Sequence, residues 1–281
     1  MFEKIAVIGV GFMGGSFALA YRELFDCKIF GVDIKPEALR KAKDLRIIDE
    51  GSTRIEDLRI FEPHLVIMAT PVRTFPSIAK GLRLSIAQGC IVSDLGSVKG
   101  DLVYRMEEIL GNRFVGGHPI AGTEKAGVEH ATRNLFKDKR FILTPTPNTD
   151  PQAKESVKKL WERIGSLVEE MDPHLHDFVF GAVSHLPHAV AFALIHTIDE
   201  LSKEVNLFKY PGAGFKDFTR IAASDPIMWR DIFMENSKEV LKAMSVFAES
   251  LAKLKGLIET GNEKGIEEYL RHASSKRKGI D

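Results

Sequence analysis

Three glycines near the start of the chain have the spacing of a dinucleotide-binding turn. Residues 9–14 read Gly-Val-Gly-Phe-Met-Gly and fit the pattern G-x-G-x-x-G. The first glycine allows a tight turn, the second lets the backbone approach a pyrophosphate, and the third lets a helix pack closely on a strand. The pyrophosphate is expected at the positive end of that helix. The expected cofactor contacts are Gly9, Gly11, Phe12, Met13 and Gly14.

An acidic residue at the end of the next predicted strand selects the form of the cofactor. Asp33 follows Gly14 by about 20 residues, which is the spacing expected in a dinucleotide-binding unit. Its carboxylate would accept hydrogen bonds from the ribose 2′-hydroxyl and repel a 2′-phosphate, so NAD is expected over NADP, although Lys35 would soften this preference. Thr70 and Pro71 follow another strand at the same edge and are further expected contacts.

Two later loops carry groups suited to acid–base chemistry beside a nicotinamide. Residues 93–99 read Ser-Asp-Leu-Gly-Ser-Val-Lys, and residues 116–124 read Gly-Gly-His-Pro-Ile-Ala-Gly-Thr-Glu. The neutral imidazole of His118 could accept a hydroxyl proton while hydride leaves the same carbon. A histidine held only by backbone hydrogen bonds would suit the position equally well.

The second half of the chain adds two segments with polar and ionisable groups. Residues 184–188 read Ser-His-Leu-Pro-His, and Pro187 predicts a kinked helix because it lacks an N–H group. Residues 212–222 form a glycine-rich bend followed by Lys, Asp and Arg side chains. Four histidines are close in sequence, but neither cysteine nor a clear carboxylate set accompanies them, so no metal is expected. These histidines are His174, His176, His185 and His188.

The elements that would position these residues change character near residue 172. Before it, short apolar runs alternate with helical patterns, which predicts a mostly parallel sheet covered on both faces. The predicted strands are residues 4–10, 28–33, 65–69, 90–94, 114–117, 140–144 and 167–171. After Asp172 and Pro173, an N-cap and a first-turn proline, the pattern is helical. We therefore expect an α/β chain with a Rossmann-type, doubly wound sheet in residues 1–172 and an all-α helical domain in residues 173–281.

The last long helix carries an apolar seam. Its members, spaced alternately by four and three, are Val240, Met244, Phe247, Leu251, Leu254 and Ile258. Such a seam forms the core of a helical bundle or the interface between two subunits. The bundle core is the simpler interpretation, and both hold if two helical domains interlock.

Composition excludes several classes of partner. Lys plus Arg and Asp plus Glu each number 39, and this balance argues against nucleic-acid or polybasic membrane binding. The two cysteines, Cys27 and Cys90, give no disulfide framework. The longest clean apolar run in the second half, residues 189–195, is about a third of the roughly 20 residues that a membrane span needs. Without a signal-peptide pattern, a cytoplasmic location is expected.

In order and spacing, these motifs resemble the prephenate dehydrogenase family. The resemblance includes the glycine motif and the segments 94–99, 117–122, 184–188 and 214–222. It implies a Rossmann domain followed by a helical domain that forms a homodimer. It also implies an enzyme of tyrosine biosynthesis, which converts prephenate and NAD to 4-hydroxyphenylpyruvate, carbon dioxide and NADH.

The resemblance also assigns roles to individual residues. His118 is implied to accept the proton of the ring 4-hydroxyl, and Ser97 to orient His118, the hydroxyl and the nicotinamide. Arg220 is implied to hold a substrate carboxylate, which suits a planar bidentate donor. His188 and the backbone of Gly214 are implied contacts to the substrate.

Four further residues have implied roles around the substrate. Glu124, Lys216 and Asp217 are implied to support or gate the site. Trp229 resembles a residue that reaches the site of a neighbouring subunit. Because prephenate is a dianion, the cations expected to face it are Arg220, Lys216 and Lys99.

Three other functions are open at this point. Arogenate dehydrogenases share these motifs and act on an amino acid analogue of prephenate. The β-hydroxyacid dehydrogenases share the two-domain plan, but they resemble one another in a lysine on the interdomain helix, and no Lys occurs in residues 172–202. A non-catalytic NAD sensor could keep the glycine motif, but it would have no need of His118, Ser97 and Arg220.

Overall fold

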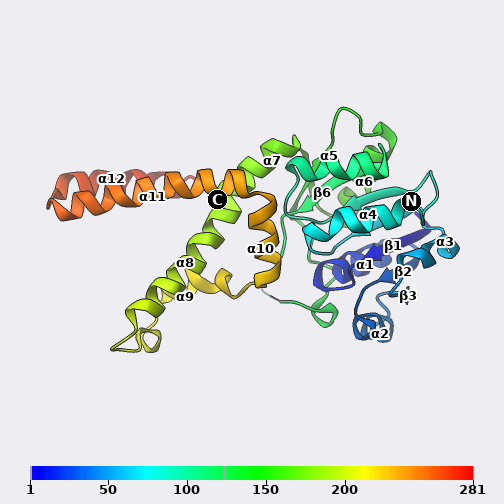
Figure 1. Ribbon diagram of the computed structural model, residues 1–281, viewed down its shortest axis with the longest axis horizontal. Coiled ribbons are helices and arrows are strands. Elements are labelled where there is room, and N and C mark those ends of the chain that lie inside the picture. Colours follow the sequence, from blue (N-terminus) through cyan, green and yellow to red (C-terminus); the bar gives the residue numbers. More distant parts are fainter. Residues whose placement is uncertain (1, 123–124, 281) are drawn as a thin grey trace.

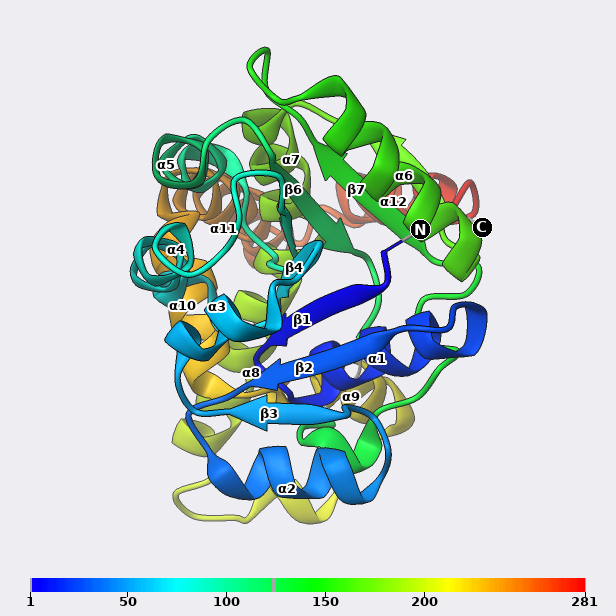
Figure 2. The same ribbon diagram turned by 90° about the vertical axis from the view of Figure 1, so that its right-hand side faces the viewer.

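The computed structural model describes residues 2–122 and 125–280, and its first part is built on one sheet. The strands are β1 Lys4–Ile8, β2 Lys28–Val32, β3 Glu50–Ser52, β4 Leu65–Met68, β5 Ile91–Asp94, β6 Phe114–Pro119, β7 Arg140–Thr144 and β8 Leu167–Glu170. They are arranged in the order β3-β2-β1-β4-β5-β6-β7-β8 (Figures 1 and 2). The sheet is parallel from β3 to β6, and β7 pairs antiparallel with β6. The predicted Rossmann-type, mostly parallel sheet is therefore confirmed.

Helices cover both faces of this sheet. The helices of the first part are α1 Phe12–Leu24, α2 Pro36–Asp44, α3 Leu58–Phe61, α4 Phe75–Arg83, α5 Gly100–Leu110 and α6 Pro151–Ile164. Helices α1 and α6 lie on one face, while α4 and α5 lie on the other (Figure 2). Side chains of β1 alternate between the two cores: Ile5 and Val7 join one, Ala6 and Ile8 the other. Burial on both faces explains why the strands read as continuous apolar runs.

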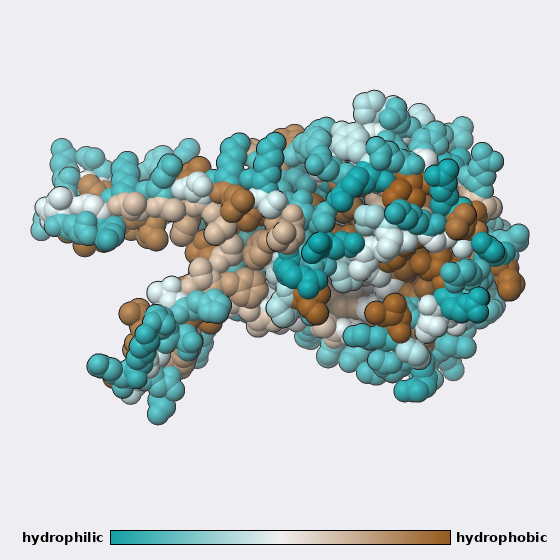
Figure 3. Space-filling view, in the orientation of Figure 1, coloured by the Kyte–Doolittle hydropathy of each residue, from teal (hydrophilic) through white to brown (hydrophobic). Residues whose placement is uncertain are grey.

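A region of helices follows, and its two arms diverge from the sheet (Figures 1 and 3). Its helices are α7 Pro173–Phe180, α8 Leu186–Leu201, α9 Ala213–Thr219, α10 Pro226–Glu235, α11 Ser237–Glu259 and α12 Glu263–Arg277. A π turn over Gly181–His185 joins α7 to α8, and Pro187 is the second residue of α8. The irregularity predicted at Pro187 therefore takes the form of a π turn, a feature common at functional sites.

The apolar seam on α11 is exposed in the single chain. Val240 is buried, but Phe247 is 39% exposed, Leu251 55% and Ile258 61%. The interpretation of the seam as a bundle core is therefore wrong for one chain alone: α12 packs beside α11, but most of the seam remains exposed.

The helix that begins the second part passes the length and composition test for a membrane span. The continuous segment Pro173–Leu201 has 29 residues and a mean hydropathy of 1.7 in its most apolar window, of which 22% is buried. From the sequence no membrane span is expected, because the apolar run at residues 189–195 is short. In the structure this run is part of a longer helix whose neighbouring residues are also largely apolar. Its first turns, however, bury His176, Asp177 and His185 against other parts of the chain. Ionisable groups with polar partners there indicate a helix of a folded domain.

Candidate active site

The glycine turn after β1 has the shape that a dinucleotide requires. Gly9 has φ +91°, and a Cβ atom there would lie 2.6 Å from the carbonyl oxygen of Ala69. A Cβ on Gly14 would lie 2.1 Å from the carbonyl oxygen of Gly9. At Gly11 a Cβ would meet nothing within 4 Å among the described residues. Gly9 and Gly14 thus serve the turn itself, while the backbone at Gly11 is open to a ligand.

Hydrogen-bonding groups surround this open backbone. Helix α1 begins at Phe12 with no side-chain cap among the described residues, so its first N–H groups point toward the turn. The buried Phe12 ring leaves its backbone amide as the group able to contact phosphate. The Asp33 Oδ2 atom accepts the Val10 N–H at 2.8 Å, and its Oδ1 atom accepts the Lys35 N–H at 2.9 Å. These bonds hold the carboxylate beside the turn and leave lone pairs for ribose hydroxyls.

The remaining expected cofactor residues lie next to the turn. A Cβ atom on Gly9 would lie 2.8 Å from Thr70 Cγ2, so Thr70 borders the glycine directly. The Thr70 and Thr74 hydroxyls are 2.8 Å apart, and the Thr74 hydroxyl donates to the Pro71 carbonyl at 2.7 Å. Thr70 and Pro71 therefore lie in an ordered loop. Met13 is partly buried and packs on the core below the turn.

A buried ion pair connects the ends of β5 and β6. The Lys99 ammonium donates to Asp94, and both side chains are 1% exposed. Asp94 also accepts the Gly96 N–H at 2.8 Å and the Gly117 N–H at 3.0 Å. Burial raises the pKa of the Asp94 carboxyl, while the Lys99 ammonium and these amides oppose the rise. Lys99 is thus engaged inside the protein, so the expectation that it faces the substrate is wrong.

His118, at the end of β6, contacts a second histidine from α7. Its Nδ1 atom lies 2.8 Å from Nε2 of His176, whose Nδ1 atom lies 2.9 Å from Oδ1 of Asp177. Burial, followed by the charges of His176 and Lys99, lowers the pKa of His118 well below its usual 6.5. The ring is therefore neutral at pH 7, as a proton acceptor must be. In the described part of the chain, the bond at Nδ1 is the one hydrogen bond of this ring.

Ser97 was expected to orient His118, but the hydrogen bond on His118 in the structure comes from another residue. The bond that orients His118 comes from His176, while the Ser97 backbone faces His185. Burial lowers the pKa of His185 to about 4. The Asn236 side chain lies 3.1 Å from Nδ1 of His185, which fixes this ring between the loop and α11. Ser97 itself is half-buried at the same edge of the sheet.

His188 and Trp229 form a stacked pair within one chain. Their ring centroids are 3.7 Å apart with 21° between the planes, and His188 Nδ1 donates to the Ser184 carbonyl at 2.9 Å. Trp229 is 5% exposed and packs on Val98. Within one chain Trp229 is therefore buried, and its expected contact with the site of a neighbouring subunit stays a prediction. His188 lies in the first turn of α8, directly after the π turn, and its stacking partner Trp229 contacts the loop that follows β5.

The remaining predicted substrate residues lie on and after α9. Gly214, Lys216 and Asp217 are exposed there, and neither charged side chain makes an ion pair within the described residues. Arg220 follows α9, and its charge lowers the pKa of His188, although burial contributes more. Arg220 thus lies near the His188–Trp229 stack. Glu124 lies outside the described residues.

Sequence reasoning missed the role of His176 and Asp177. His176 was weighed as one of four histidines that could bind metal, and no group of three or more metal ligands occurs among the described residues. One signal could have found the pair. Asp172 and Pro173 predict the start of a helix, and in that helix His176 and Phe180 are four residues apart. They therefore share one helix face, which in the structure contacts His118.

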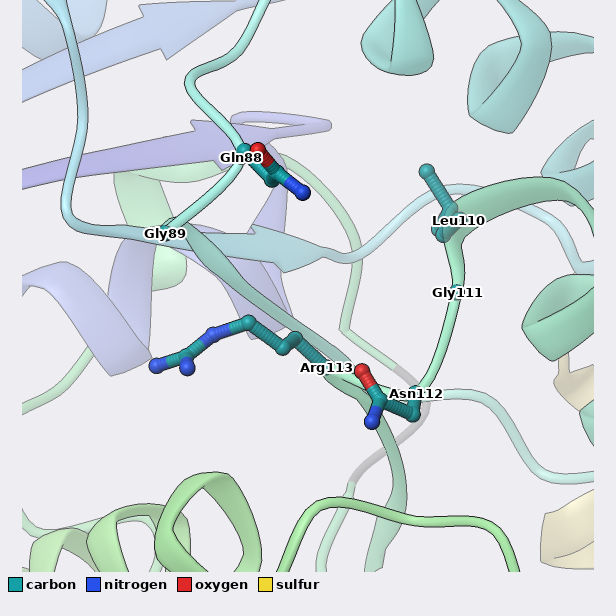
Figure 4. A pocket seen from close by; sticks show the side chains of 6 residues that line it. All are labelled: Gln88, Gly89, Leu110, Gly111, Asn112 and Arg113. Atoms are coloured by element: carbon teal, nitrogen blue, oxygen red, sulfur yellow. The ribbon is translucent and has the colours of Figure 1, made fainter.

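A surface hollow lies at the opposite edge of the sheet (Figure 4). Its lining residues are Gln88, Gly89, Leu110, Gly111, Asn112 and Arg113. They precede β5 and β6, so the hollow lies at the amino ends of the strands. In parallel α/β sheets ligands bind at the carboxyl ends, where the glycine turn and His118 lie.

Comparison with known proteins identifies the family. The prephenate dehydrogenase nucleotide-binding domain matches residues 17–170, and the prephenate dehydrogenase dimerization domain matches residues 172–272. A prephenate dehydrogenase from Bacillus subtilis (strain 168) is 35% identical over 285 residues, which cover 100% of this chain and 76% of that protein. A cyclohexadienyl dehydrogenase from Zymomonas mobilis is 32% identical, with 99% of this chain and 96% of that protein covered.

Solved structures agree with this assignment. Prephenate dehydrogenase from Aquifex aeolicus, crystallised with hydroxyphenyl propionate and NAD+, is 55% identical with a TM-score of 0.97, covering 100% of this chain and 99% of that one. An arogenate dehydrogenase from Synechocystis is 26% identical with a TM-score of 0.82, covering 99% of this chain and 100% of that one. The chain therefore belongs to the prephenate dehydrogenase family of NAD-dependent oxidoreductases.

Proposed function

We propose that this chain catalyses the oxidative decarboxylation of prephenate to 4-hydroxyphenylpyruvate and carbon dioxide, with reduction of NAD+ to NADH. One observation carries the proposal. A buried, neutral histidine, His118, stands at the same sheet edge as the glycine turn, and its hydrogen-bonded nitrogen is Nδ1. The other nitrogen is then the acceptor for a substrate hydroxyl proton.

The residues around the glycine turn fit NAD. The backbone at Gly11 and the first amides of α1 would hold the pyrophosphate, and Asp33 would accept the ribose hydroxyls. When bound, NAD+ supplies a nicotinamide ring that accepts hydride. Thr70 and Pro71 border the same turn and would close its side.

The protein's own groups account for the remaining chemistry. His118 Nε2 takes the proton of the 4-hydroxyl as C4 loses hydride. The bond between the ring and its carboxylate then breaks, carbon dioxide leaves, and the electron pair enters the ring, which becomes aromatic. The phenolate oxygen can recover the proton from His118. Arg220 would hold the carboxylate of the substrate side chain. Ser97 would contact the substrate from the loop after β5, and His188 from the first turn of α8.

The proposed reaction is tested by measuring NADH or NADPH formation with prephenate and with arogenate. We expect the highest kcat/KM for prephenate with NAD+. The Synechocystis relative is an arogenate dehydrogenase, so arogenate is the substrate that must be compared. Turnover of arogenate alone would replace the proposed substrate. Tight NAD+ binding without turnover of either compound would instead support a sensor.

We also propose that the chain forms a homodimer through its helical domain and acts in the cytoplasm. The exposed seam of α11 and the apolar side chain of Val183 in the π turn before α8, which is 67% exposed, support an interface with a second copy. The matching family domain is described as a dimerization domain. Leu251→Glu should yield monomers in sedimentation analysis, because it places a charge in the seam. The matched control, Lys253→Glu on the same helix, should stay dimeric, and monomeric wild-type protein would contradict the proposal.

A further inference from the structure

The His118 ring can serve as a base through only one of its nitrogens. A neutral imidazole carries a proton on one nitrogen and a free lone pair on the other. The proposed reaction needs the lone pair on the nitrogen that faces the substrate. Since Nδ1 lies 2.8 Å from His176, Nε2 has to be the acceptor, and the proton has to stay on Nδ1.

We propose that His176 and Asp177 are positioning residues that keep the His118 proton on Nδ1 and its lone pair on Nε2. This inference deepens the proposed function and rests on it for the role of His118. Neither residue has to touch the substrate. They act through the direction of two consecutive hydrogen bonds.

The direction of these bonds follows from the Asp177 end of the chain. Oδ1 of Asp177 lies 2.9 Å from His176 Nδ1 and accepts the Lys99 backbone N–H at 2.8 Å. An ionised carboxylate has no proton to give, so His176 Nδ1 must donate. A neutral His176 then has its lone pair on Nε2. That lone pair can only accept, so His118 Nδ1 must donate to it.

The charge states that this order requires agree with the surroundings. Burial is the main cause that lowers the pKa of both His118 and His176 well below 6.5, so both rings are neutral at pH 7. Burial raises the pKa of Asp177 to about 6, and its carboxyl is therefore mostly ionised at pH 7. Lys99 and His185 are the other ionisable groups whose charges shift the pKa values of these three residues.

The packing holds the pair rigidly against His118. His176 is 0% exposed, and the Phe180 ring covers both histidines at centroid distances of 5.0 and 4.5 Å. The Asn236 amide donates to the Asp177 carbonyl at 2.8 Å and so connects this turn of α7 to the start of α11. When Nε2 of His118 takes a proton, Nδ1 keeps its own and continues to donate to His176. No proton has to move along the chain.

Two substitutions at His176 separate the hydrogen bond from the packing. His176→Phe keeps an aromatic ring but removes the acceptor, so the His118 proton is free to move to Nε2. His176→Gln can present its Oε1 atom near the position of the lost Nε2 and still accept from His118. We expect kcat to fall by about 10²–10⁴ in His176→Phe, the range seen when a general base is removed or held in the wrong tautomer. KM for NAD+ should change little, and His176→Gln should recover most of the lost kcat.

The tautomer of His118 can also be measured without substrate. In the full-length protein labelled with ¹⁵N-histidine, NMR distinguishes a protonated from an unprotonated ring nitrogen, and His118→Asn identifies the signals. We expect the proton on Nδ1 in the wild type and in His176→Gln, and on Nε2 in His176→Phe. A wild-type proton on Nε2 would overturn the inference, as would equal kcat in the Phe and Gln variants. Because the wild-type measurement needs no turnover, it decides the inference even if prephenate is not the substrate.

Discussion

Replacing Lys99 by methionine should strongly destabilise the fold, because the Asp94 carboxylate would lose its cation. Both side chains are 1% exposed, and among the described residues Asp94 would keep the N–H groups of Gly96 and Gly117 as its partners. Removing one member of a buried ion pair typically costs about 3–5 kcal/mol. We expect a loss in this range in the free energy of unfolding, measured by urea denaturation at one fixed protein concentration.

The double variant Asp94→Asn/Lys99→Met tests the reason for this loss. Asparagine offers one acceptor oxygen where aspartate offers two, so either Gly96 or Gly117 loses its partner, at a cost of about 1–3 kcal/mol. The double variant should therefore be more stable than Lys99→Met alone, although it carries one more substitution. If it is less stable than the single variant, the unpaired carboxylate is not the cause, and the reasoning is refuted.

Four further predictions concern the reaction. His118→Asn should lower kcat by about 10²–10⁴ and leave the Kd for NAD+ unchanged, because it removes only the proton acceptor; full turnover in steady-state assays would contradict this. The wild-type acidic limb of kcat should lie below pH 6.5, since the base form of His118 is lost only as pH falls through its lowered pKa. In Lys99→Met that limb should move to higher pH, because the Lys99 charge helps to lower this pKa, and a limb that does not move would argue against the effect. Asp33→Ala should narrow the ratio of kcat/KM for NAD+ over NADP+, because the group that repels the 2′-phosphate is gone; an unchanged ratio would mean that other groups select the cofactor.

The sheet could be predicted because its buried strands are continuous apolar runs in the sequence. A run such as residues 65–69 is apolar at every position, and in the structure both faces of β4 are covered. The short strand β3 could not be found this way, because Glu50, Gly51 and Ser52 carry no apolar pattern. Its pairing with β2 comes from the backbone alone. The same limit applies to the seam of α11, whose pattern is the same for a core and for an interface.

The cofactor turn could be predicted from the sequence, but the hydrogen-bond partners of His118 could not. Gly9 and Gly14 are local requirements of one turn, so their spacing is visible in the sequence. The contact between His118 and His176 joins residues 58 positions apart, on a strand and on a helix, and leaves no local pattern. Lys99 was predicted to face the substrate because lysine is almost never fully buried unless it is paired. Its pairing with Asp94 could not be recognised from the sequence.

The surroundings of His118 have to satisfy two opposed demands during one turnover. Before the reaction the ring must be neutral, and burial together with the Lys99 charge disfavours the protonated form. After the proton arrives the ring is briefly a cation, and an uncompensated buried cation would raise the barrier. Asp177 compensates the positive charge on His118 without touching it, because two hydrogen bonds through His176 connect its carboxylate to the ring. Burial raises its pKa to about 6, so the carboxyl stays mostly ionised at pH 7. The intervening His176 therefore lets the site support a transient imidazolium without charging His118 in advance.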